Sequence, residues 1–254
     1  MKIKILGSSV EHVDRLQYVS SYLVNGTVAI DAGCLGFYST PQDQEAIRHV
    51  FLTHSHSDHT ASLPIFIENA WTPADDCPRV YGSPETLDSV QKHIFNDVMW
   101  PDFVALSKNM PPFLDLCPLT DEVQVSVDGL RITPVRVNHV IPTLAYVVSD
   151  AKSAVIFGAD SGPTNRIWEM AHKVTNLRAV FIEACFPNYL TELARASLHL
   201  TSEMLAREVA KMPAGVTIVA VHLKVRYRDE VARELHALQL PNLVIGECEH
   251  VYEF

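Results

Sequence analysis

The feature that most constrains this chain is a dense cluster of histidine and aspartate that directly follows an apolar segment. Residues 49–53 are strand-like, and residues 54–59 read His-Ser-His-Ser-Asp-His. A turn that leaves a strand cannot bury four such side chains in an apolar core. It can wrap them around cations, because neutral imidazole and carboxylate are the ligands that zinc and similar metals prefer. The spacing therefore predicts a two-metal hydrolytic site rather than a histidine-rich surface loop.

Length and composition fit a folded globular domain. The 254 residues are 48% hydrophobic, and no apolar run reaches the roughly 18 residues that a membrane-spanning helix needs. The chain enters a strand pattern at residue 2 without the pattern of an export signal, so we expect a cytoplasmic protein with no membrane partner. We expect residues 1–254 to form a single domain. The five cysteines are odd in number and lack C-x-x-C spacing, which favours reduced packing residues.

The charge balance bears on the partners that the chain can bind. Thirty acidic against twenty basic side chains give a formal net charge of −10, which repels a long phosphate backbone and disfavours a nucleic-acid partner. A small anionic substrate is compatible with this charge, because bound metal ions add local positive charge. The sequence does not determine the oligomeric state, and a homodimer is compatible with it.

Short β-type runs alternate with helical patterns, which predicts a mixed α/β fold. The runs 21–24 and 27–30 flank Asn25-Gly26, which is typical of a β-hairpin turn. The remaining predicted strands are 2–6, 49–52, 123–127, 130–137, 144–148, 154–157, 179–182 and 216–221, and the predicted helices lie near 84–98, 164–174, 201–212 and 229–238. Residues 107–121, which contain three prolines, are predicted to be a loop.

Four chemically active side chains lie at the carboxyl ends of predicted strands or within three residues beyond them. They are His139, Asp160, Glu183 and His222. Because sheets gather binding sites at such ends, we expect the four to converge with the 54–59 cluster on one rim. Asp31, which follows the strand 27–30, is expected either to hydrogen-bond a ligand histidine or to cap a turn.

This ordered ligand pattern resembles that of the metallo-β-lactamase superfamily, whose fold is a four-layer αβ/βα sandwich of two sheets flanked by helices. The resemblance implies two ligand sets bridged by Asp160, which are His54, His56 and His139 for one ion and Asp58, His59 and His222 for the other. Zinc is the first expectation for both ions, with manganese or iron as alternatives, since histidine and aspartate bind all three. The complete set argues against the non-enzyme alternative, a metal-free scaffold protein of the superfamily.

Longer segments resemble the class II 3′,5′-cyclic nucleotide phosphodiesterases of that superfamily. These segments are residues 53–59, 93–96, 100–103, 157–163, 181–188, 199–201 and 222–224. The chain departs from that family at Ser57, Ala61-Ser62, Ser197-Leu198 and Val225, positions that bear on loop shape and substrate preference. The resemblance implies hydrolysis of cyclic AMP, or cyclic GMP, to the 5′-monophosphate by hydroxide formed at the dinuclear site.

The resemblance also implies roles in catalysis and substrate binding. Asp58 would orient the attacking water, and His199 would protonate the leaving 3′-oxygen, with Glu183 raising the pKa of His199. Predicted substrate contacts are His93, Phe95, Asn96 and Trp100 as a base-binding wall and Lys224 as a phosphate contact. Instead of binding substrate, the aromatic side chains could be core residues and Lys224 could lie in a solvated turn.

Two other activities of the superfamily are alternatives. A tRNA 3′-processing endonuclease of the RNase Z type would also use Glu183 and His199, but it needs a basic docking arm that neither the charge balance nor a Lys/Gly-rich insertion supplies. A β-lactamase or thioester hydrolase would leave the segments 93–103 and 183–199 unexplained.

Overall fold

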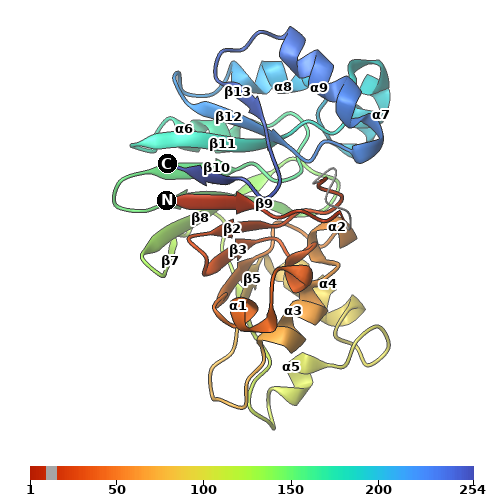
Figure 1. Ribbon diagram of the computed structural model, residues 1–254, viewed down its shortest axis with the longest axis vertical. Coiled ribbons are helices and arrows are strands. Elements are labelled where there is room, and N and C mark those ends of the chain that lie inside the picture. Colours follow the sequence, from red (N-terminus) through yellow and green to blue (C-terminus); the bar gives the residue numbers. More distant parts are fainter. Residues whose placement is uncertain (10–15) are drawn as a thin grey trace.

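The computed structural model describes residues 1–9 and 16–254, which form two seven-stranded sheets packed face to face (Figure 1). The first sheet contains, in spatial order, β14 (Val251–Glu253), β1 (Lys2–Ile5), β2 (Tyr22–Val24), β3 (Val28–Ile30), β4 (His49–Phe51), β5 (Arg79–Gly82) and β6 (Asp115–Pro118). The second contains β13 (Leu243–Ile245), β12 (Thr217–Val221), β11 (Leu177–Glu183), β10 (Ala154–Phe157), β9 (Thr143–Ser149), β8 (Leu130–Val137) and β7 (Val125–Val127).

Helices from each half of the chain lie outside the sheet of that half, as Figure 1 shows for the orange and yellow helices at one end and the blue helices at the other. The N-terminal half contributes η1 (Leu35–Phe37), α1 (Pro41–Glu45), α2 (Ser57–Thr60), α3 (Leu63–Ala70), α4 (Pro84–His93) and α5 (Phe103–Leu106). The C-terminal half contributes α6 (Arg166–Ala171), η2 (Asn188–Leu190), α7 (Thr191–Ser197), α8 (Ser202–Val209), η3 (Val225–Tyr227) and α9 (Arg228–Ala237). The predicted four-layer αβ/βα sandwich is confirmed. Within the described ranges, no helix is both long and apolar enough to cross a membrane.

Three apolar layers hold these elements together. The central layer joins the inner faces of the two sheets, where the Tyr22 and Phe157 rings lie 5.3 Å apart and the Phe51 and Tyr146 rings 5.6 Å apart. The two outer layers lie between each sheet and its helices. In one of them, Phe66 of α3 packs on the first sheet, and in the other the helices of the C-terminal half pack on the second sheet. Because both faces of the interior strands are covered, a strand such as β10 is apolar at every position.

The sequence predicted the interior strands closely and the remaining elements less well. The hairpin is confirmed, since β2 and β3 pair antiparallel and Asn25 and Gly26 have φ of 51° and 83°. The prediction of a continuous loop over 107–121 was wrong, because residues 115–118 form β6. Among the described strands, β6 pairs only with β5, at the edge of its sheet, where a proline is tolerated.

One helix prediction and the prediction of a turn over residues 54–59 also need correction. The predicted helix 84–98 ends at His93, because Asp97 adopts φ 60° and Phe95 forms a bridge with Trp100. The 54–59 cluster is not all loop, since α2 begins at Ser57. A short helix of this kind leaves too few residues for its period to be read in the sequence.

Strand direction brings the predicted functional segments to one rim. Strands β10, β11 and β12 are mutually parallel, and β8 runs the same way because β9 is antiparallel to both β8 and β10. In the first sheet, β3 and β4 are also parallel. The chain segments that follow these strands therefore leave their sheets together, which is the arrangement that a shared site needs.

A methyl group at Gly33 would collide with the backbone that holds the 54–59 cluster. Its Cβ would lie 2.3 Å from the Asp58 carbonyl oxygen and 2.8 Å from the Ser20 carbonyl oxygen. We predict that Gly33→Ala lowers the free energy of unfolding by about 1–3 kcal/mol, the usual cost of overpacking, as measured by urea denaturation. In the control Gly7→Ala the nearest atom is 3.4 Å away, so a loss as large as that of Gly33→Ala would contradict the steric argument.

Candidate metal centre

Three turns at the rim contain a residue with left-handed backbone. Asp31 directly follows β3 with φ 62°, Ala159 precedes Asp160 with φ 57°, and His222 directly follows β12 with φ 55°. A non-glycine residue in this conformation costs roughly 1–3 kcal/mol, and such residues cluster at functional sites. The packed strands before these turns hold them in place, and each turn presents Asp31, Asp160 or His222 to the rim.

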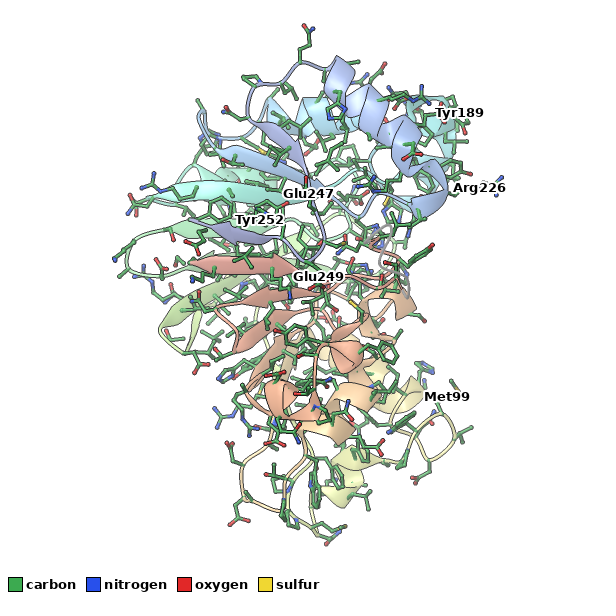
Figure 2. All side chains as sticks on the ribbon, viewed as in Figure 1. Met99, Tyr189, Arg226, Glu247, Glu249 and Tyr252 are labelled. Atoms are coloured by element: carbon green, nitrogen blue, oxygen red, sulfur yellow. The ribbon has the colours of Figure 1, made fainter. Side chains whose placement is uncertain are left out.

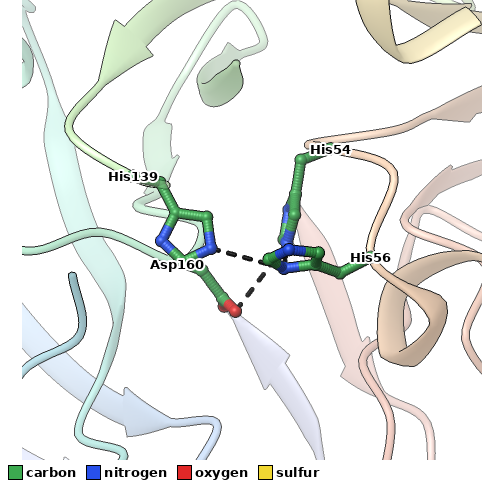
Figure 3. Close-up of side chains that lie close together, drawn as sticks. All are labelled: His54, His56, His139 and Asp160. Carbon is green, nitrogen blue, oxygen red and sulfur yellow. Dashed lines mark hydrogen bonds and ion pairs between the residues drawn. The ribbon is translucent and has the colours of Figure 1, made fainter. Parts of the chain in front are cut away.

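The first group of candidate ligands consists of His54, His56, His139 and Asp160, with one ligand atom from each residue within 4.8 Å of the others (Figure 3). His56 Nδ1 lies 3.0 Å from His54 Nε2 and 3.4 Å from His139 Nε2. Asp160 Oδ2 lies 3.9 Å from His54 Nε2. Three imidazoles and one carboxylate thus converge from both sheets.

The second group consists of Asp58, His59, His222 and again Asp160. His59 Nε2 lies 3.2 Å from His222 Nε2 and 3.3 Å from Asp160 Oδ2. Asp58 Oδ2 lies 3.4 Å from His222 Nε2. Asp160 therefore belongs to both groups, and its bridging of two ions, which the family resemblance implies, stays a prediction.

The spacing of these atoms fits small divalent ions. Zinc–nitrogen bonds of about 2.0–2.1 Å in a tetrahedral site place two ligand nitrogens about 3.3 Å apart. The imidazole nitrogens within the two groups are separated by 3.0, 3.4 and 3.2 Å. The two groups are able to hold metal ions, and a donor set of nitrogen and carboxylate oxygen suits zinc, manganese or iron. Which metal binds, and how many ions, stay predictions.

The protonation states of the first group, including Asp160, favour metal binding. Burial lowers the pKa of His54 well below its usual value and also lowers the pKa values of His56 and His139, so these rings are neutral ligands. Burial alone would raise the pKa of Asp160, but the positive charge of His222 and His59 outweighs it and holds this pKa well below the usual range. Asp160 is therefore a carboxylate.

Residues just behind the ligands orient two of the rings. Asp31 Oδ2 lies 2.7 Å from His59 Nδ1, and the Asp31 carboxylate accepts hydrogen bonds from the backbone N–H and the hydroxyl of Thr53. The Thr53 hydroxyl lies 2.9 Å from His54 Nδ1. Of the two predictions for Asp31, the hydrogen bond to a ligand histidine is the one observed. Thr53 was not predicted, since a threonine at the end of a strand has no distinctive sequence signal.

Glu183 and His199 form a buried pair beside the second group. His199 Nδ1 donates to Glu183 Oε1 at 2.8 Å, and the Glu183 carboxylate also accepts from the backbone N–H groups of Ser161 and Leu200 at 2.8 and 3.0 Å. Burial lowers the pKa of His199, but the charge and hydrogen bond of Glu183 outweigh burial, so this pKa is raised overall. The ring can therefore carry a proton on Nε2 while Nδ1 is held by Glu183.

Cys185 makes contacts with site residues that its predicted packing role did not include. Its sulfur lies 3.1 Å from His222 Nδ1, 3.3 Å from the His222 carbonyl oxygen and 3.3 Å from His199 Nδ1. Burial raises the pKa of this thiol well above its usual value. Cys185 is a buried free thiol in the outer core of the second sheet, as predicted for a packing residue, and it also contacts two histidines of the site. Its position two residues after Glu183, at a strand end, was the available signal.

The structure does not bring the predicted base-binding wall to these groups. Phe95 is 1% exposed within the outer core of the first sheet, so the prediction of a stacking face is corrected, because its ring offers no free face. Trp100 packs partly on the same core, the Asn96 amide accepts from two backbone N–H groups of its own turn, and His93 is exposed. Among the described residues, no hydrogen bond, ion pair or ring contact connects these four with a candidate ligand.

Lys224 lies at the metal groups, as its predicted role requires. Its Nζ donates to Asp58 Oδ2 at 3.1 Å. The nearby Arg226 is visible beside α9 in Figure 2, whereas Met99, from the turn of the predicted base-binding wall, lies in the N-terminal half. The cationic side chains that accompany the centre thus come from the segment after β12.

Comparison with known proteins agrees with this geometry. A family model described as a beta-lactamase superfamily domain matches residues 28–223, and the chain belongs to the metallo-β-lactamase superfamily. Its fold and its complete set of candidate ligands define a hydrolase of this superfamily.

Three similarities are more specific than the family. The chain is 24% identical over 211 residues, 73% of its length, to a Yersinia pestis protein named a probable 3′,5′-cyclic-nucleotide phosphodiesterase, of which it covers 60%. It is 33% identical over 132 residues, 48% of its length, to a ribonuclease Z of Mycobacterium marinum, of which it covers 47%. The chain thus spans less than two thirds of either relative. The crystal structure of unliganded yeast PDE1 matches with a TM-score of 0.80 over 98% of both chains at 17% identity, which is a likeness of fold.

Asp160 should be needed for both ions, since it belongs to both groups. We predict that Asp160→Ala lowers the metal content of the dialysed protein from two ions per chain to one or none, because each group loses a carboxylate ligand. Elemental analysis measures this content. The control Glu192→Ala removes an exposed carboxylate on α7 and should leave two ions. A folded Asp160→Ala protein that retains both ions would show that Asp160 is not a bridging ligand.

Proposed function

We propose that this chain is a metal-dependent phosphodiesterase that hydrolyses 3′,5′-cyclic nucleotides, cyclic AMP first and cyclic GMP second, to 5′-monophosphates. The observation that carries the proposal is the hydrogen-bonded Glu183–His199 pair beside two groups able to bind metal. Hydrolysis of a phosphodiester needs an activated water, stabilisation of charge on the phosphoryl oxygens, and a proton for the leaving alkoxide. The rim places residues suited to each of these tasks within one site.

Two divalent ions in these groups would lower the pKa of a water and offset charge on the phosphoryl oxygens. Asp58 then has a second task besides metal binding. Its pKa is held below the usual range, against the effect of burial, by the hydrogen bond from His222 and the nearby positive charges, so it is a carboxylate that can accept a hydrogen bond from the attacking water. Lys224, which donates to the same carboxylate, restricts its orientation.

His199 is suited to donate the proton. Glu183 holds His199 Nδ1 and is itself held by two backbone N–H groups, so the ring cannot turn freely and Nε2 is the nitrogen that faces away from Glu183. The raised pKa of His199 keeps part of the population protonated near neutral pH. The 3′-oxygen of the substrate would take this proton as its bond to phosphorus breaks.

A cleft beside the second metal group has room for a small anionic substrate. It has a volume of about 320 Å³, and its lining includes His222, Lys224, Arg226 and Tyr18. Ligand pockets commonly start at about 300 Å³. Two cations and an aromatic ring next to a candidate metal ligand suit the charge and the planar base of a nucleotide.

The RNase Z activity is the second candidate, supported by the similarity to the mycobacterial ribonuclease Z. A pre-tRNA substrate presents many phosphates, and the affinity of its binding proteins depends on basic side chains that contact them. The formal net charge of this chain is −10. This charge favours a small cyclic nucleotide over a pre-tRNA.

The product distinguishes the proposed reaction from its alternatives. We predict that the zinc- or manganese-loaded protein converts 3′,5′-cyclic AMP to 5′-AMP, because attack on phosphorus expels the 3′-oxygen that His199 can protonate. Liquid chromatography against authentic 5′-AMP and 3′-AMP identifies the product, with the Asp160→Ala protein as the inactive control. Release of 3′-AMP alone would contradict the proposed reaction. Cleavage of pre-tRNA without turnover of any cyclic nucleotide would favour the RNase Z activity.

Loss of His199 should matter less when the leaving group needs no proton. We predict that His199→Ala keeps its metal and lowers kcat for cyclic AMP by roughly a hundredfold or more, in the range of general acid catalysis. With a p-nitrophenyl phosphodiester, much of the wild-type rate should return. Steady-state kinetics on both substrates make the test, with the exposed His172→Ala as a control expected to behave as wild type. Equal slowing on both substrates would make His199 a structural residue.

A further inference from the structure

The ring of His222 is held from two sides. Its Nε2 faces the second metal group, at 3.2 Å from His59 Nε2 and 3.4 Å from Asp58 Oδ2. Its Nδ1 faces Cys185 Sγ at 3.1 Å. A histidine that binds metal through Nε2 carries its proton on Nδ1, so this N–H donates to the sulfur.

The sulfur also contacts the backbone of the same residue. Cys185 S–H donates to the His222 carbonyl oxygen at 3.3 Å. One thiol thus accepts from the ring of His222 and donates to its main chain. This double contact matters because His222 has a left-handed backbone with φ 55°, a conformation that persists only when its surroundings enforce it.

The backbone places Cys185 opposite His222. Strands β11 and β12 pair in parallel up to Glu183 and Val221, and the ladder is extended by the Ala184 N–H bonded to the Val221 carbonyl oxygen at 3.0 Å. Cys185 is 0% exposed, so solvent does not compete for its sulfur. The position is therefore rigid.

The second group contains two candidate ligand rings, and their hydrogen-bond partners differ in kind: Cys185 for His222 and Asp31 for His59. His59 Nδ1 lies 2.7 Å from the Asp31 carboxylate, a strong acceptor that also raises the basicity of the ring. A thiol is a weak acceptor and a weak donor. On its Nδ1 side, the ring of His222 is consequently held by a weak hydrogen bond to sulfur rather than by a charged hydrogen bond.

We infer that Cys185 is a positioning residue that fixes the ring orientation and the tautomer of His222 and thereby sets the affinity of the Asp58–His59–His222 group for its ion. The inference rests on the metal centre of the proposed function and is independent of the substrate. The same sulfur lies 3.3 Å from His199 Nδ1, but the shorter hydrogen bond of His199 Nδ1, at 2.8 Å, is to Glu183 and does not involve the sulfur. The first group, with His54, His56 and His139, has no contact with this sulfur among the described hydrogen bonds.

The test is a zinc titration of the metal-free protein in competition with a chromophoric chelator, without substrate. Cys185→Ala removes both contacts and leaves a cavity, whereas Cys185→Val removes both contacts and keeps most of the volume. We expect each variant to bind one of the two ions about 10–100-fold more weakly, the usual cost of losing such a partner of a ligand. The other ion should bind as in wild type. Cys185→Ser retains a donor and an acceptor and should restore most of the affinity.

Cys34→Ala is the matched control, because Cys34 is also buried and its sulfur contacts the Leu6 carbonyl oxygen at 3.8 Å. It should bind both ions as wild type does.

Unchanged affinity for both ions in Cys185→Ala and Cys185→Val would overturn the inference, as would an equal loss at both ions, which indicates a general structural role. If wild type binds fewer than two ions, the inference fails together with the two-metal centre. Absence of cyclic-nucleotide hydrolysis alone would overturn the proposed substrate and leave this result standing.

Discussion

The candidate site depends on the apolar layer between the two sheets, because each sheet supplies only part of the ligand set. The first sheet carries residues 54–59, and the second carries His139, Asp160 and His222. Two hydrogen bonds lock the sheets together at the site itself, from the Tyr146 hydroxyl to the Leu52 carbonyl oxygen at 2.6 Å and from the Leu144 N–H to the Thr53 carbonyl oxygen at 2.9 Å. Because a metal site requires precise placement of its ligands, the packing of the two sheets sets the geometry of the ligand groups.

Charge balance at the rim explains how so many ionisable groups can be buried together. Asp31 and Asp160 are both buried, and the ring of His59 lies between them, at 2.7 and 3.3 Å. Burial alone would lower the pKa of His59, but the two carboxylates outweigh it and raise this pKa well above the usual value. A buried charge is costly unless it is paired and hydrogen-bonded. In the fold, the charges of the residues that could bind metal thus also neutralise one another.

Local patterns were enough to predict much of the framework and the kinds of residue in the site. A β-type run with polar residues interspersed predicted β8, and a continuous apolar run predicted β10, both with their observed bounds; Asn25-Gly26 predicted the first hairpin. The 54–59 spacing predicted metal-binding chemistry, because four such side chains in sequence have few other uses. Aromatic spacing misled at Phe95, since a ring at helical spacing has the same pattern in a core as on a binding wall.

The sequence by itself determined the ligand types, their positions at the ends of predicted strands and the acidic charge that disfavours nucleic acid. Only the tertiary structure decided which ring nitrogen of each histidine faces the centre, that Asp31 holds His59 rather than capping a turn, and that Cys185 joins His222 to the Glu183–His199 pair. The reason is physical. Periodicity and spacing report which face of an element a residue occupies, whereas a contact such as that of Cys185 with His222, 37 residues apart, depends on the twist and packing of whole sheets.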